Sequence, residues 1–340
     1  MKHPYLIASA MSAFLATTAL AQQSTDSVDP EDSSAGNAMG FSAAAMAAMD
    51  AKAAGQPTSA ENWMVAAANP HAVEAGARVL REGGTAADAM VAVQAVLGLV
   101  EPQSSGLGGG AFLVWYDGTT GKITTLDGRE KAPLAATPRL FQTGDGEKLK
   151  FWDAVVGGRS VGVPGTPALM EAAHDNWGRS DWAGLFTEAI MLAEDGFEVS
   201  PRLAGLVASG SERLSRFKRT RDYFFPDGVA IAEGSTLVNA AYGTTLRHLA
   251  ASGSDAFYTG ANADDIVATV RTAAGNPGVM DHIDLALYDV VERPAVCVTY
   301  RAHDVCGMGP PSSGALTVGQ ILGTLESYDI GAMDAGDPNA

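Results

Sequence analysis

The sequence predicts an α+β fold, because segments typical of helices and of strands mix along the chain without a regular strand–helix–strand alternation. Three observations lead to this prediction. Residues 86–100 are apolar on nearly all sides, which is typical of a buried helix. Strand-like segments flank turns near 117–121 and 301–302, as in two β-hairpins. Apolar residues make up 46% of the 340 residues, so the chain can bury a large core.

The first two predicted helices carry clear start and stop signals. Asn69 and Pro70 are typical of a helix start, and Gly83 is typical of the residue that follows a helix end. Thr85, followed three residues later by Asp88, resembles a capping box in which Asp replaces the usual Glu or Gln. Two consecutive helices are therefore expected between residues 70 and 100.

The later elements follow from apolar periodicity and from turn residues. Strands are expected over 112–116 and 122–126, and a hairpin over 295–307. Further helices are expected over 182–194, 236–251, 264–272 and 318–325.

The N-terminus is typical of a secretory signal peptide. Residues 5–20 are mostly apolar after a short polar start, and Ala19-Leu20-Ala21 matches a small-residue cleavage site. The segment is too short and too poorly flanked for a stable membrane span. We expect residues 1–21 to be removed and the mature protein to be exported, periplasmic or extracellular, with no membrane span.

Residues 22–60 form a distinct compositional region. They are rich in Ala, Ser, Gly, Asp and Met and contain few large apolar side chains, which indicates a flexible leader. Order is expected to begin near Trp63, in a short strand-like run over 63–66. The folded region is therefore expected to occupy residues 61–340.

The net charge narrows the class of partner. Asp and Glu number 39 against 22 Lys and Arg, which gives −17 at pH 7. Such an excess repels nucleic-acid backbones and anionic membrane surfaces. The sequence therefore predicts no nucleic-acid partner, and it suits a protein that acts on small molecules.

The segment SGLGGGA, residues 105–111, is the densest glycine cluster and contains G-x-G-x-x-A, a loose form of the dinucleotide-binding pattern. Such a site needs a strand before the glycines and a helix after them, so that the helix N-terminus meets the pyrophosphate. The predicted order here is the reverse, and no Walker A sequence follows. The glycines are instead expected to permit positive φ or a close approach of two backbones.

Other patterns give weak signals for chemistry. The six histidines show no metal-ligand spacing, so no metal site is expected. Ser215 and Lys218 match S-x-x-K, but they lie in the basic run 213–221 and lack the partner motifs of a serine β-lactamase. A solvated basic surface is the favoured interpretation of this run.

The two cysteines, Cys297 and Cys306, are expected to face each other across the second hairpin. In an exported protein this spacing favours a disulfide, and two half-buried free thiols remain the alternative.

Arg129 lies in the sequence DGREKAP, at the end of the second predicted strand. Its guanidinium fork suits a carboxylate ligand. From these residues alone, an ordinary surface ion pair with Asp127 or Glu130 is favoured.

Six segments, taken in order along residues 63–330, resemble the γ-glutamyltranspeptidase (glutathione hydrolase) family. They are MVAAANPHAVEAGARVLREGGTAADAMVAVQAVLGLVEPQSSGLGGGAFLVWYD, LDGREKAP, SVGVPGTPALMEAAHDNWG, AIMLAEDGFEVS, GSDAFYTG and PPSSGALTVGQIL. The resemblance implies an N-terminal nucleophile hydrolase of αββα architecture.

The resemblance also implies an activity and a role for Arg129. In that family a precursor cleaves itself before a Thr, which becomes the N-terminus of a small subunit and attacks the γ-glutamyl carbonyl of compounds such as glutathione. The γ-glutamyl group then passes to water or to an amino acid, and no cofactor is needed. By resemblance, Arg129 binds the α-carboxylate of the substrate, which reverses the preference for a surface pair.

The chain departs from the family pattern in one respect that bears on catalysis. Thr-Thr pairs occur at 17–18, 119–120, 124–125 and 244–245, and none precedes His. The catalytic Thr is therefore expected to be missing, and the chain resembles a large subunit truncated before its natural end and inactive alone. Gly314-Ala315 also replaces the family's usual Gly-Gly. The alternatives are a cephalosporin or glutaryl acylase relative, a non-catalytic binding fragment, and a serine β-lactamase-like enzyme that uses Ser215.

Overall fold

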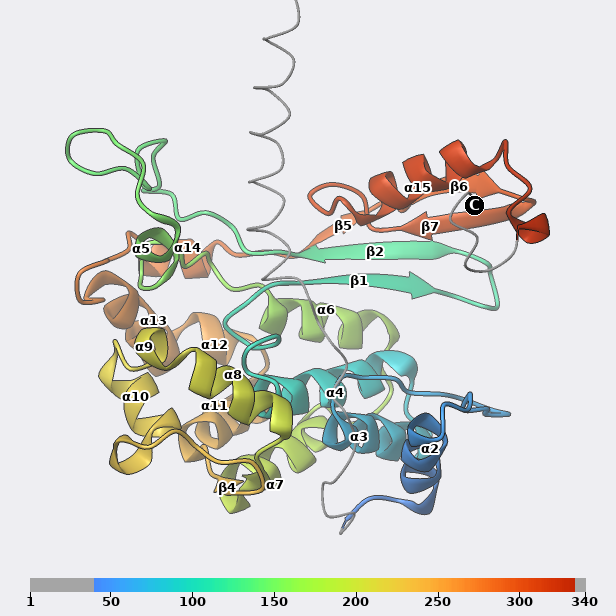
Figure 1. Ribbon diagram of the computed structural model, residues 1–340, viewed down its shortest axis with the longest axis horizontal. Coiled ribbons are helices and arrows are strands. Elements are labelled where there is room, and N and C mark those ends of the chain that lie inside the picture. The colour runs from blue at the N-terminus through green and yellow to red at the C-terminus, as the bar shows by residue number, and fades with distance from the viewer. Residues whose placement is uncertain (1–39, 334–340) are drawn as a thin grey trace, which may run out of the picture. The chain divides into compact units, whose positions relative to one another are not determined.

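The structure, a computed structural model, describes residues 40–333 (Figure 1). The predicted signal peptide over 1–21 and residues 22–39 of the predicted leader lie outside the described residues. The helices are α2 (Ala43–Ala53), α3 (Pro70–Arg81), α4 (Ala86–Val100), α5 (Phe151–Val155), α6 (Thr166–Trp177), α7 (Thr187–Asp195), α8 (Pro201–Ser209), α9 (Ser211–Leu214), α10 (Lys218–Phe224), α11 (Ala240–Ser252), α12 (Asp255–Tyr258), α13 (Gly260–Arg271), α14 (His282–Ala286) and α15 (Gly314–Leu325). The strands are β1 (Ala111–Tyr116), β2 (Ile123–Gly128), β3 (Phe197–Glu198), β4 (Thr236–Leu237), β5 (Val291–Arg293), β6 (Val296–Tyr300) and β7 (His303–Gly307). This mixture confirms the α+β prediction.

The largest described sheet has the order β1-β2-β5, and all its pairs are antiparallel (Figure 1). Helix α6 packs against β1 and β2, where Leu126 of the sheet and Leu169 of the helix are both buried. Trp115 of β1 stacks on Trp177 at the end of α6, with ring centroids 4.7 Å apart. The first hairpin was therefore predicted correctly, and β2 continues to Gly128, directly before Arg129.

Helices α3 and α4 form the centre of the core. The Asn69 side chain accepts a hydrogen bond from the backbone N–H of His71, and Gly83 follows α3 with a φ of 92°. The central residues of α4, such as Val91 and Val96, are fully buried. These observations confirm both predicted helices and the buried character of the second.

The later helices exist where the sequence predicts them, but their starts differ. Residues 182–194 divide into a short 3₁₀ helix, Ala183–Phe186, and α7. Residues 236–237 form β4, and α11 begins only at Ala240, because the Asn239 side chain caps the N–H of Tyr242 at 3.0 Å. Helices α13 and α15 each begin four residues before the predicted position.

The start of order was predicted wrongly. Helix α2 lies inside the segment that was predicted to be a flexible leader, and residues 63–66 form no strand. The helix is favoured by its alanine content and by Ser42, whose side chain caps it. Ser42 is itself bound by Glu74 of α3, with Oγ and Oε2 2.7 Å apart. This contact between distant residues has no signature in local composition.

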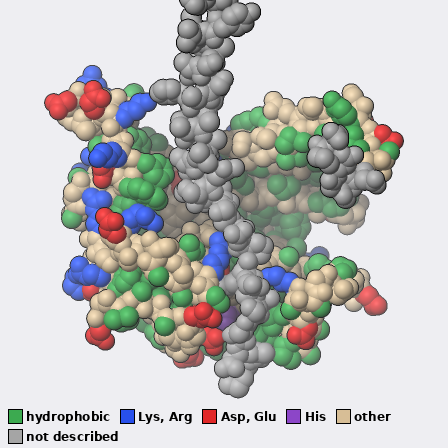
Figure 2. All heavy atoms as spheres, in the orientation of Figure 1, with side chains coloured by type: hydrophobic (Ala, Val, Ile, Leu, Met, Phe, Trp, Pro, Cys, Tyr) green, Lys and Arg blue, Asp and Glu red, His purple; other side chains and the backbone are tan. Residues whose placement is uncertain are grey.

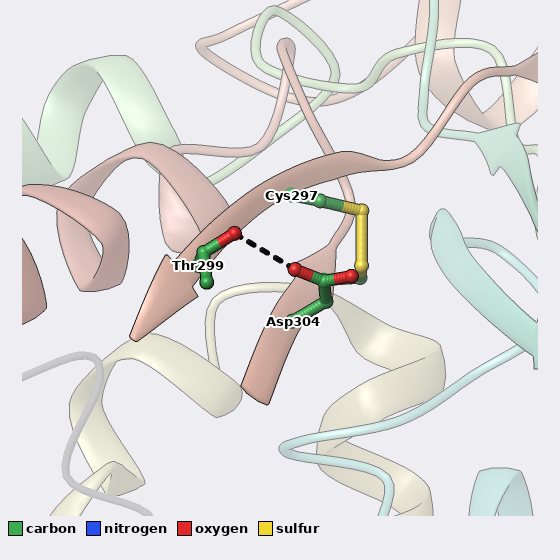
Figure 3. The surroundings of a disulfide bond; sticks show 4 residues. Cys297, Thr299 and Asp304 are labelled. Carbon is green, nitrogen blue, oxygen red and sulfur yellow. Dashed lines mark hydrogen bonds between the residues drawn. A yellow bond between two sulfur atoms is a disulfide. The ribbon is translucent and has the colours of Figure 1, made fainter. Parts of the chain in front are cut away.

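The second hairpin contains a disulfide bond between Cys297 and Cys306 (Figure 3). Strands β6 and β7 pair so that the two cysteines are directly opposite, as predicted, and their Cα atoms are 4.1 Å apart. Two pairs further along, Thr299 Oγ1 donates to Asp304 Oδ1 at 2.9 Å (Figure 3). Helix α15 packs on this hairpin. The predicted bridge is confirmed, and the alternative of two free thiols is not.

Asp88, at the start of α4, joins the helix to a distant loop. Its carboxylate closes the predicted capping box with Thr85 and also accepts the backbone N–H groups of Arg179 and Ser180 at 3.0 and 3.2 Å. Burial by itself would raise the pKa of Asp88, but the hydrogen bonds from Thr85, Arg179 and Ser180 outweigh it and hold the pKa below its usual value. The ionised carboxylate therefore stabilises the folded state.

Substitution of Asp88 by Asn is expected to lower the free energy of unfolding by about 1–3 kcal/mol at neutral pH, because backbone donors lose a charged acceptor. A lowered pKa in the folded state means that the Asp88 contribution is complete above about pH 4 and is lost as pH falls through the folded-state pKa. Urea unfolding of the wild-type and Asp88→Asn proteins should therefore show a difference in the free energy of unfolding that becomes smaller as the pH falls. The exposed Asp145→Asn serves as the control. A pH-independent difference would contradict the assignment.

No helix within residues 40–333 is long and apolar enough to cross a membrane.

Candidate functional site

The site predicted from the sequence lies where the first hairpin meets the glycine loop 105–110. Ala111 of β1 pairs with Gly128 of β2, so Gly110 lies beside Arg129 at the end of the hairpin. A Cβ atom on Gly110 would be 2.9 Å from Arg129 Cα and 2.7 Å from Glu130 N. Since these are backbone atoms, only glycine allows the loop to approach Arg129 this closely.

The two interpretations of the glycine loop therefore have different outcomes. The close backbone approach is confirmed at Gly110, whereas Gly106, Gly108 and Gly109 have room for a side chain. None of the four has a φ in the left-handed region, so the expectation of positive φ is wrong. Helix α4 precedes the loop and β1 follows it, which is the order that argued against dinucleotide binding.

A hollow of about 570 Å³ lies beside the loop and is lined by several of its glycines. The remaining lining residues are Gln94, Gly98, Pro102, Ser104, Ser105, Glu130 and Thr166. Glu130 is the only ionisable side chain among these lining residues, and it is an acid. A phosphate group would meet a carboxylate here and no cation, which also disfavours phosphate binding.

The carboxylate of Asp127 is already used by other groups. Its Oδ1 atom accepts the backbone N–H of Arg129 at 3.1 Å, and its Oδ2 atom accepts Arg293 Nε of β5 at 2.8 Å. Asp127 is buried, with 7% of its surface exposed. The sequence placed Asp127 beside Arg129 as an ion-pair partner, but Arg293 occupies that position from 166 residues away.

The Arg129 guanidinium has no carboxylate partner within ion-pair distance among the residues that the structure describes. The side chain is exposed, and its Cζ atom lies 5.9 Å from the ring centroid of Phe112 on β1. The surface ion pair with Asp127 or Glu130 is therefore wrong. An exposed guanidinium without a carboxylate partner among the described residues is chemically suited to an anionic ligand, above all a carboxylate.

A buried ion pair fixes the segment that leads into the glycine loop. Glu101, which ends α4, is 1% exposed and accepts Arg202 Nη1 of α8 at 2.9 Å. Asn69 Nδ2 donates to the other carboxylate oxygen at 3.2 Å, and Gln103 also donates to Glu101. Arg202 further reaches Ser104 Oγ at 3.4 Å. The network joins three helices at the base of the loop.

The other sequence candidates do not form a site with this one. Ser215 follows α9, and Lys218 is highly exposed and pairs with Asp222 on its own helix. The run 213–221 is mostly exposed, and Figure 2 shows Lys and Arg side chains over this part of the surface. This agrees with the interpretation of a solvated basic segment. Within residues 40–333, no three His, Cys, Asp or Glu side chains are grouped as metal ligands would be.

The Thr-Thr pairs within the described residues occupy ordinary structural positions. Residues 119–120 lie in the turn between β1 and β2, and residues 124–125 are buried in β2. Thr244 and Thr245 lie in α11, where each hydroxyl donates to the carbonyl four residues earlier. These three pairs therefore lie in a turn, a strand and a helix within the chain.

Comparisons with known proteins agree with this architecture. A family model described as gamma-glutamyltranspeptidase matches residues 72–340. The glutathione hydrolase proenzyme of Bacillus subtilis (strain 168) is 39% identical over 274 residues, which are 81% of this chain and 46% of that protein. The acylase ACY 1 proenzyme of Pseudomonas sp. (strain SE83) is 33% identical over 291 residues, 84% of this chain and 51% of that protein. The crystal structure of Helicobacter pylori gamma-glutamyltranspeptidase superposes with a TM-score of 0.79 at 34% identity, covering 83% of this chain and 80% of that one.

The chain thus spans about half the length of these two proenzymes.

Proposed function

The chain belongs to the gamma-glutamyltranspeptidase family, and we propose that it is the large-subunit portion of an exported γ-glutamyltransferase or glutathione hydrolase. Its fold class is that of the N-terminal nucleophile hydrolases, of which this chain contains the large-subunit part. The observation that most supports the proposed activity is the exposed Arg129 guanidinium, which has no carboxylate partner among the described residues. We propose that Arg129 binds the α-carboxylate of a γ-glutamyl donor such as glutathione.

The catalytic nucleophile is proposed to come from a small subunit of the same precursor. A Thr hydroxyl at the N-terminus of that subunit attacks the γ-glutamyl carbonyl and forms an ester as the amide C–N bond breaks. The hydroxyl proton passes through the Thr α-amine to the leaving amine. Water or an amino acid then attacks the ester and regenerates the Thr. In this scheme Arg129 holds the donor, so that the γ-carbonyl meets the Thr.

Exposed surfaces of the chain support a small-subunit partner. Strand β1 is at the edge of its sheet, and Val114 on it is 48% exposed. Helix α15 has no buried residue, and Leu316 and Ile321 are 46% and 52% exposed. Apolar side chains are visible on this part of the surface in Figure 2. An unpaired edge and apolar helix face are features that proteins usually cover with another segment.

A second candidate is an acylase that removes glutaryl groups, because an acylase is also among the relatives. A glutaryl group carries the same carboxylate as a γ-glutamyl group and lacks only its α-amine. Arg129 would therefore serve either substrate, and donors that differ in the α-amine distinguish the two activities.

The experiment compares this chain alone with the longer precursor, both expressed with the signal peptide and assayed with γ-glutamyl- and glutaryl-p-nitroanilide. We expect the exported precursor to begin at Gln22 and to cleave itself before a Thr. It should turn over the γ-glutamyl donor faster than the glutaryl donor, whereas this chain alone should show no turnover. Turnover by the chain alone would contradict an external nucleophile. Faster glutaryl cleavage would identify an acylase, and an uncleaved, inactive precursor would indicate a binding role.

A further inference from the structure

We propose that Tyr288 is a positioning residue for carboxylate recognition, which holds the Arg129 backbone so that the guanidinium is aimed at the donor. Tyr288 lies between α14 and β5, and its hydroxyl donates to the Arg129 carbonyl oxygen at 2.8 Å. The two residues are 159 positions apart in the chain. The inference rests on the proposed function, since it concerns how Arg129 performs the role given to it there.

The Arg129 backbone is fixed on both sides by specific contacts. Its N–H donates to Asp127, its carbonyl accepts from Tyr288, and Gly110 packs against its Cα atom. Because each peptide unit is planar, anchoring the N–H and the carbonyl fixes the planes on either side of the Cα atom. The direction of the Cα–Cβ bond is then set, and only the side-chain torsions of Arg129 remain free.

The Tyr288 ring is itself held in place. It stacks on Tyr258 with an interplanar angle of 2° and ring centroids 5.6 Å apart. Lys131 Nζ lies 4.8 Å from the Tyr288 ring centroid and donates to the carbonyl of Asp289 at 2.7 Å. Tyr258 donates its own hydroxyl to the Pro164 carbonyl at 2.9 Å. A ring fixed by stacking and by a cation can hold its hydroxyl at one point.

Gly165 leaves the space in which this hydrogen bond forms. A Cβ atom on Gly165 would lie 2.0 Å from the Gly128 carbonyl oxygen and 2.1 Å from Tyr288 Oη. The Gly165 N–H donates to the Gly109 carbonyl at 2.8 Å, which connects the glycine loop to the same point. Any side chain at position 165 would therefore displace either the strand end or the Tyr288 hydroxyl.

The Tyr288 hydroxyl stays protonated and able to donate. Burial raises its pKa, and the negative charges of Asp127, Glu130 and Asp289 raise it further. The hydrogen bond to the Arg129 carbonyl therefore persists throughout the neutral and mildly alkaline range.

The test is Tyr288→Phe in the complete enzyme, because Phe keeps the stacked ring and removes only the hydroxyl. We expect KM for γ-glutamyl-p-nitroanilide to rise about 3- to 10-fold, the effect of one neutral hydrogen bond, with kcat little changed. KM for 4-aminobutanoyl-p-nitroanilide, which lacks the α-carboxylate, should be unchanged. Tyr328→Phe, at an exposed tyrosine, is the matched control.

The KM values, and the ratio of KM between the two donors, do not depend on the concentration of active enzyme. Both are therefore independent of the fraction of the enzyme that folds. The double variant with Arg129→Lys should bind the γ-glutamyl donor no worse than Arg129→Lys alone, since Tyr288 acts through Arg129. An unchanged KM in an active Tyr288→Phe enzyme, or an equal rise in KM for both donors, would overturn the role of Tyr288 but not the proposed function. A wild-type precursor without turnover would overturn the proposed function and this role with it.

Discussion

Substitution of Arg129 by Lys in the complete enzyme is expected to raise KM for γ-glutamyl donors about 10- to 100-fold. The guanidinium fork makes two parallel hydrogen bonds to a carboxylate, whereas an ammonium keeps the charge but loses this geometry. One hydrogen bond to a charged group contributes about 1.5–3 kcal/mol, and about 1.4 kcal/mol corresponds to a tenfold change in affinity. Because the carboxylate is held in both ground and transition states, kcat should change less than KM.

Steady-state kinetics with γ-glutamyl-p-nitroanilide measure this effect directly. Arg139→Lys is the matched control, because Arg139 is also an exposed arginine in a loop but lies outside the glycine-loop site. The control should leave KM unchanged. An unchanged KM in Arg129→Lys would show that the guanidinium does not bind the donor.

Substitution of Arg202 by Ala is expected to lower the free energy of unfolding by about 3–5 kcal/mol, which is typical when a buried charge loses its partner. Glu101 would keep Asn69 and Gln103 as donors but would lose its cation in a position that is 1% exposed. The effect should be large because the network joins α3, α4 and α8 at the base of the glycine loop.

Urea unfolding of the chain, followed by circular dichroism, gives the measurement. Arg271→Ala removes an ion pair with Asp281 whose side chains are both about half exposed, and it should cost about 0–1 kcal/mol. Equal losses in the two variants would show that the Glu101–Arg202 pair is no more important than a surface pair.

Features that depend on neighbouring residues could be predicted from the sequence. The caps at Asn69 and Thr85 mark the starts of α3 and α4 correctly, since a capping residue acts on backbone groups two or three positions away. The facing cysteines follow from the two-residue turn of their hairpin, where Arg301 and Ala302 adopt φ values of 48° and 64°. In both cases the residues that interact lie within about ten positions of each other in the sequence.

Features that depend on distant residues could not be predicted from local patterns. Arg293 takes the Asp127 carboxylate, so Arg129 lacks the neighbour that its position in the sequence indicates. Helix α2 depends in part on the contact of Ser42 with Glu74. Tyr288 carries no sequence signal either, because its partner lies 159 residues away. The resemblance to the family indicated Arg129, but only the structure shows what holds it.

The central claim is that Arg129 recognises the α-carboxylate of a γ-glutamyl donor. It is tested most directly by the ratio of kcat/KM for γ-glutamyl-p-nitroanilide to that for 4-aminobutanoyl-p-nitroanilide, in wild-type enzyme and in Arg129→Lys. We expect the wild-type enzyme to prefer the donor with the carboxylate strongly, and the substitution to reduce this preference about 10- to 100-fold. A preference that survives the substitution unchanged would contradict the claim.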